Sequence, residues 1–235
     1  MTNLFLDIET APNFGSAEEY FKVKNAVESG QLTQNSPEKD SFWKYKMGSL
    51  NPFDGKITLI TFQINDGPVK HLKEWESNES DILNEFYQSL VDLNKYRSDQ
   101  EHLRIIGHNI LNFDIFFLHE RLKTHFSSNA KWIYQWLIRK PEIIDFLQMH
   151  LPLNNLQTKG LRHNVLAYAY GFEQKITTGE DTISDYFNKQ YDRIMEYSNQ
   201  EFIYPQLYSK ILNGGLISKE RLSESINVVI SSQAK

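Results

Sequence analysis

The chain has 235 residues, of which 40% are hydrophobic, and its 30 acidic and 25 basic residues give a formal net charge of −5. This length fits one domain of about 200 to 250 residues, and the apolar content excludes a chain that is disordered throughout. The absence of cysteine excludes disulfides, thiolate metal sites and a cysteine nucleophile, so any metal must be held by oxygen or imidazole ligands.

No uncharged apolar run approaches the roughly 18 residues that cross a bilayer, and Asp7 and Glu9 lie where a signal peptide would carry basic residues. We therefore expect a soluble, cytoplasmic protein without a membrane partner. The acidic balance does not support a broad basic surface for duplex nucleic acid, which normally raises the pI above about 9. It is compatible with an enzyme whose carboxylates hold metal ions, because the ions then meet the phosphate.

The first predicted strand, Asn3–Ile8, is a short apolar run without alternation, which is typical of a central strand buried on both faces. Residues 11–54 are rich in Asn, Ser, Gly, Glu and Lys, and this stretch is far longer than the usual connection of about 4 to 6 residues. We interpret 11–54 as an insertion. The segments Lys56–Asn65 and Val69–Trp75, separated by a turn signal, predict a hairpin.

Apolar residues recur at helical spacing over Ser80–Tyr96 and over Leu111–Lys123, which predicts two surface helices. Between them, Leu103–Gly107 has the composition of a short buried strand. After them, Pro141–Leu151 is an apolar segment around Asp145.

The last third of the chain is mostly helical by pattern, over Leu161–Tyr170, in a short turn at Thr182–Phe187 and over Tyr191–Leu212. A glycine pair at 214–215 predicts the end of the last helix. The residues that follow form a tail with one amphipathic set of apolar side chains.

Acidic side chains occur where predicted strands and helices begin or end. Asp7 and Glu9 project from one face of the first strand, because strand side chains alternate. Asp114 lies in the first turn of the helix that follows the strand at 103–107. Tyr197 and Glu201 lie one helical turn apart, at i and i+4 on one face.

Most of these features also have a purely structural interpretation. Two acids at a strand end can simply be solvated. Asp114 can lie at the positive end of the helix dipole, which is worth about 0.3 to 1 kcal/mol, and Asn109 can cap the same helix. These interpretations leave the pairing of Tyr197 with Glu201 unexplained.

Three motifs, in chain order, are Leu6–Thr10 (LDIET), Asn109 with Phe113 and Asp114, and Tyr197 followed four residues later by an acid. Their order and separation resemble the motifs of the DEDD 3′–5′ exonucleases in their tyrosine form. The chain is most similar to the proofreading domain of family-B DNA polymerases and its stand-alone relatives, from about residue 3 to residue 212. The acid of the third motif is Glu201 here, whereas the family has Asp.

The resemblance implies phosphodiester hydrolysis with two divalent ions, for which oxygen ligands favour Mg²⁺ or Mn²⁺. By resemblance, Asp7 would bridge both ions. Glu9 and Glu201 would complete the ion that activates water, and Asp114 would hold the second ion, partly through water. Tyr197 would orient the attacking water.

By the same resemblance, Thr10, Asn109 and Phe113 would contact the terminal nucleotides. Phe113 offers an aromatic face for base stacking, worth about 1 to 3 kcal/mol, and a core position is an equally good interpretation of it. Aromatics and lysines interleave at Ser41–Lys46 (SFWKYK) as in a platform for single strands. We favour the interpretation in which they anchor an apolar patch of the insertion itself.

We therefore predict an α/β, ribonuclease H-like fold with a mixed five-stranded sheet flanked by helices, in which the first three strands are antiparallel and the later ones parallel to the first. The exonuclease domain would span 1–214, including the insertion, and 215–235 would be a C-terminal tail.

The predicted function is a metal-dependent 3′–5′ exonuclease that acts on single-stranded DNA ends. Its expected partners are single-stranded nucleic acid and, by resemblance, a protein of DNA replication or repair. Two alternatives stay open. The substrate can be RNA, or the chain can be a nucleic-acid-binding or partner-docking protein whose catalysis is weakened at Glu201.

Overall fold

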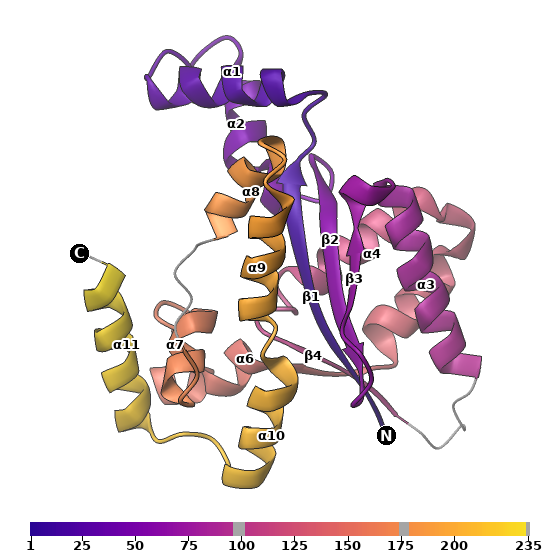
Figure 1. Ribbon diagram of the computed structural model, residues 1–235, viewed down its shortest axis with the longest axis vertical. Helices are drawn as coiled ribbons and strands as arrows, with labels where there is room; N and C mark the ends of the chain where they lie inside the picture. Colours follow the sequence, from indigo (N-terminus) through magenta and orange to yellow (C-terminus); the bar gives the residue numbers. More distant parts are fainter. Residues whose placement is uncertain (96–101, 174–178, 234–235) are drawn as a thin grey trace.

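A mixed five-stranded sheet lies at the centre of the computed structural model, and helices cover both of its faces (Figure 1). The structure describes residues 1–95, 102–173 and 179–233. The sheet order is β3-β2-β1-β4-β5, with bounds Thr2–Pro12 (β1), Gly55–Ile64 (β2), Lys70–Lys73 (β3), Leu103–Gly107 (β4) and Glu142–Asp145 (β5). The helices are Ala17–Glu28 (α1), Lys39–Met47 (α2), Glu79–Lys95 (α3), Asp114–His125 (α4), Ala130–Tyr134 (α5), Phe146–His150 (α6), His163–Ala169 (α7), Gly179–Phe187 (α8), Tyr191–Glu201 (α9), Tyr204–Gly214 (α10) and Lys219–Gln233 (α11). None of these described helices has the length and apolar character needed to cross a membrane.

The strand directions confirm the predicted α/β, ribonuclease H-like class. β1 pairs antiparallel with β2, and β2 with β3, whereas β4 and β5 run parallel to β1. Parallel neighbours need a crossover connection, and α3 and α4 lie in the two crossovers that lead to β4 and β5. The helix predicted at Ser80–Tyr96 is α3, and Tyr96 itself lies outside the described residues.

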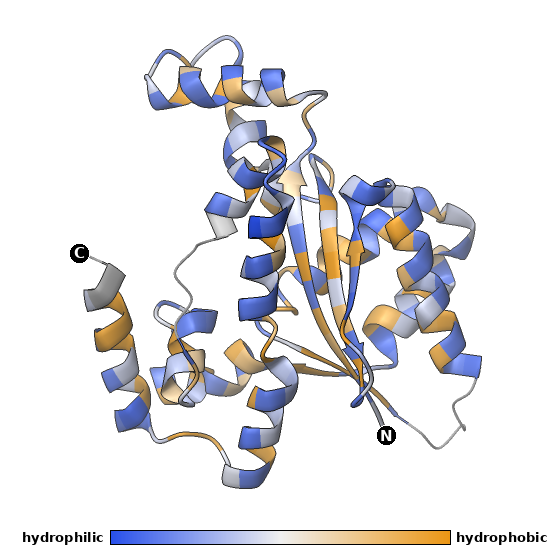
Figure 2. Ribbon diagram, in the orientation of Figure 1, coloured by the Kyte–Doolittle hydropathy of each residue, from blue (hydrophilic) through white to orange (hydrophobic). Residues whose placement is uncertain are grey.

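β1 packs into a different core on each of its faces. Leu6 and the even-numbered residues on either side of it join the core formed with α3 and α4. Phe5, on the opposite face, joins the core formed with α7, α10 and α11. Asp7 and Glu9 share the face of Phe5, because strand side chains alternate. Figure 2 shows the corresponding concentration of hydrophobic residues along the central strands.

The prediction of one helix over Tyr191–Leu212 is wrong, because the structure divides this segment into α9 and α10. α9 ends at Glu201, and Pro205 lies in the first turn of α10. In a continuous helix, the N–H of residue 205 would donate to the Glu201 carbonyl, but proline has no N–H and clashes with that carbonyl. The Ile203 N–H donates to it instead, at 2.7 Å. The break redirects the chain and brings Tyr204 back toward β1.

The predicted insertion, 11–54, begins too early by two residues, because Ala11 and Pro12 still belong to β1. The rest of it contains α1 and α2, which lie beyond the C-terminal end of β1 in Figure 1. The Tyr20 ring of α1 stacks on Phe187 of α8, with ring centroids 4.0 Å apart and an interplanar angle of 12°. Both residues belong to a small hydrophobic core that also contains Phe14. The insertion therefore packs on α8 with a core of its own.

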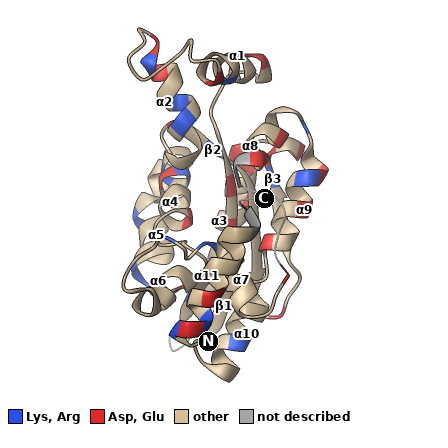
Figure 3. Ribbon diagram, turned by 90° about the vertical axis from the view of Figure 1, so that its left-hand side faces the viewer, with Lys and Arg blue, Asp and Glu red and all other residues tan. Residues whose placement is uncertain are grey.

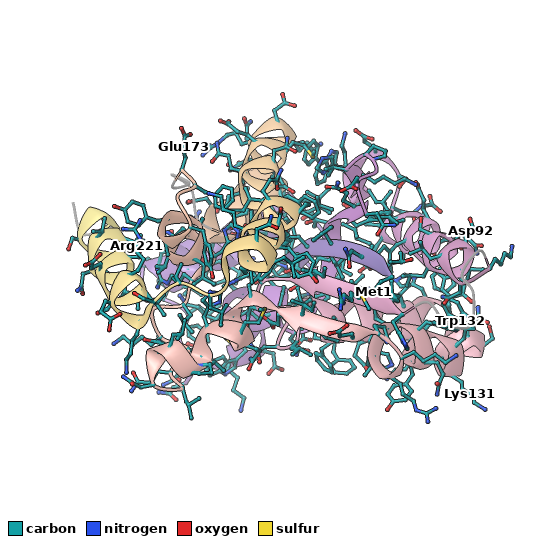
Figure 4. The ribbon with its side chains drawn as sticks, turned by 90° about the horizontal axis from the view of Figure 1, so that it is seen from below. Met1, Asp92, Lys131, Trp132, Glu173 and Arg221 are labelled. Atoms are coloured by element: carbon teal, nitrogen blue, oxygen red, sulfur yellow. The ribbon has the colours of Figure 1, made fainter. Side chains whose placement is uncertain are left out.

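The C-terminal helix α11 packs on α7. Its Leu222 and Val229 side chains are buried in the core on that side of the sheet. Figure 4 shows α11 with Arg221 at one end of the molecule, and α3 and α5, marked by Asp92 and Trp132, at the other. The sheet with its two cores lies between these ends.

Replacing Gly107 by alanine tests the packing at the end of β4. A Cβ atom there would lie 2.5 Å from the Ile110 Cγ2 atom and 2.7 Å from the Leu6 carbonyl oxygen. We expect Gly107→Ala to lower the free energy of unfolding by about 1–3 kcal/mol, as overpacked sites do. Urea unfolding measures this change in the free energy of unfolding. Gly214→Ala is the control, because a Cβ atom at 214 would meet nothing within 4 Å. Equal stability of the two variants would contradict this account.

Candidate metal centre and active-site cleft

A cleft of about 1000 Å³ opens beside the second half of β1. Its walls come from β1, the loop after β4, the beginnings of α4 and α7, the helices α8 and α9, and α1 and α2 of the insertion. In Figure 3, α2 carries basic residues on one side of the view, and α8 carries acidic residues on the other. The eight residues selected from the sequence all line this cleft: Asp7, Glu9, Thr10, Asn109, Phe113, Asp114, Tyr197 and Glu201.

Three carboxylates converge in the cleft. One oxygen each from Asp7, Glu9 and Glu201 lies within 4.8 Å of the other two. The pairing shifts between Glu9 and Thr10, which face Leu59 and Ile57, so a β-bulge at Thr58 of β2 lies opposite this part of β1, and such bulges occur beside many active sites. Glu201 reaches the pair from the last residue of α9, immediately before the helix break.

Asp114 lies next to this trio but is not part of it. Its side chain is 4% exposed, and its Oδ1 atom accepts the Ile8 N–H at 3.0 Å. Burial raises the pKa of the Asp114 carboxyl well above its usual value, and the charges of Asp7 and Glu201 raise it further. The hydrogen bond from Ile8 opposes the shift without cancelling it.

Tyr204 is a site residue that the motif analysis missed. Its hydroxyl donates to the Asp7 Oδ1 atom at 2.8 Å, and its side chain is 1% exposed. Burial, followed by the charge of Asp7, raises the pKa of the Tyr204 hydroxyl, which therefore stays a proton donor. Helical spacing does not indicate this contact, because α9 ends at Glu201 and the break before α10 turns Tyr204 toward β1.

Tyr197 lies on α9, one turn before Glu201, and is 7% exposed. Burial raises the pKa of its hydroxyl above the ordinary range, and the charges of Glu201 and Glu9 and a hydrogen bond with Glu201 add to the shift. The Tyr197 hydroxyl is thus protonated across the physiological pH range and lies among the carboxylates.

Two further helices contribute polar groups that sequence spacing gave no reason to select. The His163 Nδ1 atom of α7 lies 3.9 Å from the Glu201 Oε1 atom. The Thr182 hydroxyl of α8 donates to the Glu9 Oε2 atom at 3.4 Å. These contacts join segments that are far apart along the chain, so no local pattern could indicate them.

The buried Asp145 carboxylate fixes the loop between β4 and α4. It accepts the N–H groups of Asn109 at 2.8 Å, Leu111 at 3.0 Å and Leu147 at 2.9 Å. Asn109 has φ of 60°, in the left-handed region, which asparagine tolerates better than most residues. The loop therefore holds Asn109 and Phe113 at the wall of the cleft.

Thr10 connects the site to the insertion. Its hydroxyl donates to the Ser49 carbonyl at 2.6 Å, and Thr10 itself is 9% exposed. Ser49 also lines the cleft. The end of β1 and the insertion are thus joined by a hydrogen bond directly beside the carboxylates.

The donor set of the cleft suits a hard divalent cation. Asp7, Glu9 and Glu201 offer converging carboxylate oxygens, which are the ligands that Mg²⁺ and Mn²⁺ take in proteins. A cation there would also offset the repulsion among the partly buried acids. These three residues, with Asp114 beside them, are the ones that could hold metal.

Comparisons with protein-family models, with curated proteins and with solved structures gave no match to this chain. The function of the cleft is therefore inferred from its own residues.

Replacing Asp114 by asparagine tests the electrostatic cost of the acid cluster. The raised pKa of Asp114 means that the folded protein binds a proton more tightly than the unfolded chain does. The free energy of unfolding of the wild type therefore rises as the pH falls from above the raised pKa of the folded protein toward the ordinary pKa of the unfolded chain. Asp114→Asn keeps an acceptor for Ile8 and removes the charge. We expect a free energy of unfolding about 1 kcal/mol higher near pH 8 with chelator present, and a difference that narrows toward pH 5. Urea unfolding of the control Asp192→Asn, at an exposed position, should show neither effect. An Asp114→Asn variant that is less stable than the wild type near pH 8 would contradict this account of the acid cluster.

Removing the Tyr204 hydroxyl tests its hydrogen bond to Asp7. Tyr204→Phe keeps the buried ring and leaves a carboxylate oxygen without its donor. We expect the free energy of unfolding to fall by about 1.5–3 kcal/mol, as for hydrogen bonds to charged groups. Denaturant unfolding can compare it with Tyr134→Phe, whose ring is 45% exposed. A similar small change in both variants would show that the Tyr204 hydroxyl does not stabilise Asp7.

Proposed function

We propose that the protein is a metal-dependent 3′–5′ exonuclease that removes nucleotides from single-stranded DNA ends. The observation that carries the proposal is the convergence of Asp7, Glu9 and Glu201 on one point of a large cleft, with Asp114 beside them. Glu201 lies far along the chain from Asp7 and Glu9, and together the three acids match the motif pattern described above. Glu201 reaches the cluster in spite of replacing the family's Asp, which argues against a decayed third motif.

Asp7, Glu9, Glu201 and Asp114 would hold Mg²⁺ or Mn²⁺ in this proposal. Two such ions, when bound, supply charge neutralisation at the phosphodiester and a nucleophile at neutral pH. The chain itself provides the carboxylate ligands and fixes their positions. Hydrogen bonds hold Asp7 through Tyr204, Glu9 through Thr182 and Asp114 through Ile8, so these ligands are preorganised.

Tyr197 has the properties needed to position a water molecule for attack. Its protonated hydroxyl lies near Glu201 and Glu9, the two acids assigned to the ion that activates water. A neutral hydroxyl can donate and accept hydrogen bonds, so it can orient a water without competing for metal.

The terminal nucleotides would lie against Asn109 and Phe113. Both residues line the cleft, and the half-buried Phe113 ring belongs to the wall held by Asp145. Base stacking on an aromatic ring tolerates any sequence, as an exonuclease requires. The assignment to DNA and to a replication or repair partner rests on the resemblance alone and stays a prediction.

Matched glutamate variants on α9 test the enzyme proposal. Glu201→Gln removes a carboxylate of the cluster, whereas Glu196→Gln changes an exposed glutamate of the same helix. We expect Glu201→Gln to lower the rate of mononucleotide release by at least about 100-fold, the scale of losing one electrostatic contact in an active site, and Glu196→Gln to leave it unchanged. Asp7→Ala should abolish release while circular dichroism shows an intact fold.

The alternatives give different results in the same assays. Wild-type protein that binds a 3′ overhang with Mn²⁺ and releases no mononucleotide would be a binding or docking protein. A 5′-labelled RNA degraded faster than DNA of the same sequence would make RNA the substrate. We expect faster degradation of the DNA.

A further inference from the structure

The charged side chains that line the cleft come from several elements. Four acids lie at β1, α4 and α9, and the described lining also includes Asp181 of α8 and Glu28 of α1. Among the described residues that line the cleft, the lysine and arginine side chains are Lys24, Lys46 and Arg162. Two of these three cations belong to the insertion, Lys24 on α1 and Lys46 on α2, beyond the C-terminal end of β1 (Figure 1).

The docking of the insertion on α8 fixes the position of Lys24. The Lys24 ammonium donates to the Ser184 hydroxyl at 3.2 Å, and the Tyr20 hydroxyl lies 3.4 Å from the same oxygen. The Tyr20 ring stacks on Phe187, as described above. Lys24 also lies 3.6 Å from Glu28, whose side chain is 56% exposed, and such an exposed pair is weak.

An aromatic ring accompanies the second lysine. Tyr45 lines the cleft and packs on the small core of the insertion. The centroid of its ring lies 5.4 Å from the Lys46 ammonium nitrogen. Lys46 is exposed and can turn toward a ligand. Alternating aromatic and cationic side chains in a groove are typical of proteins that bind single strands, because bases stack while phosphates pair with cations.

We propose that Lys24 and Lys46 bind backbone phosphates of the single strand on the 5′ side of its terminal nucleotide. The strand would run from the carboxylates past the end of β1 toward α1 and α2. This inference rests on the proposed function, since it assumes that the 3′ end lies at the carboxylates. In this proposal the insertion has a role in substrate binding. Its two lysines attract the negatively charged strand, which the acids of the site would otherwise repel, and they make longer strands better substrates than a dinucleotide.

Two matched double variants test the assignment. Lys24→Gln with Lys46→Gln removes the charge of both cleft lysines and keeps polar side chains at the two positions. Lys22→Gln with Lys39→Gln removes two exposed lysines of the same helices that do not line the cleft. Both pairs lower the net charge equally, so a general loss of positive charge affects them alike.

The first measurement is binding of a fluorescein-labelled oligothymidylate by anisotropy across a salt series. All proteins carry Asp7→Asn to prevent cleavage, with Mn²⁺ present. Each phosphate contact contributes about 0.7 to the slope of log affinity against log salt for single strands. We expect the cleft pair to reduce the slope by about 1.4 and to weaken binding at least about tenfold at 0.1 M salt, while the control pair changes both much less. A slope reduced equally in both pairs, or in neither, would overturn the proposal.

The second measurement is the ratio of cleavage rates for an oligothymidylate and a thymidine dinucleotide, in proteins with Asp7 intact. The ratio should fall in the cleft pair and not in the control pair. A wild type that cleaves neither substrate, together with a reduced binding slope, would refute the nuclease function and leave the phosphate site standing. A wild type that cleaves both, with an unchanged slope and ratio in the cleft pair, would refute the lysine assignment alone.

Discussion

Repulsion between carboxylates at the end of β1 is the interaction that the surrounding structure has to accommodate. Four acids lie together, and burial leaves little water to screen them. Each acid interacts with a group from a different part of the chain: Tyr204 with Asp7, Thr182 with Glu9, Ile8 with Asp114, and His163 and Tyr197 with Glu201. If the site binds cations as proposed, a bound cation would convert this repulsion into affinity.

Local sequence patterns predict most of the strands and helices of the fold. The unbroken apolar run of β1 indicates a central strand, and the predicted bounds of β4 agree with the observed ones, Leu103–Gly107. Strand alternation alone places Asp7 and Glu9 on one face. The resemblance to the exonuclease motifs then selects Asp114 and Glu201, which the folded chain brings to the same cleft. The strand predictions depend on period and order along the chain, whereas the choice of these two acids depends on the resemblance.

The remaining features depend on contacts between distant elements. Nothing near Thr182 or His163 in the sequence indicates that α8 and α7 face the carboxylates, and the docking of Tyr20 on Phe187 is equally non-local. The break between α9 and α10 is different, because Pro205 is a local signal for a helix break and lies within the segment whose periodicity predicts one continuous helix. That break is what gives the site Tyr204.

The helix α8 contacts both halves of the cleft within a few residues. Thr182 meets Glu9, while Ser184 and Phe187 meet α1 of the insertion. A ligand that tightens α1 on α8 would therefore also steady Glu9. Thermodynamic linkage makes such coupling reciprocal, so that nucleic acid and cation would each raise the affinity for the other by the same factor. With such coupling, the proposed site would bind metal weakly in the absence of a single strand and more tightly once a strand is bound.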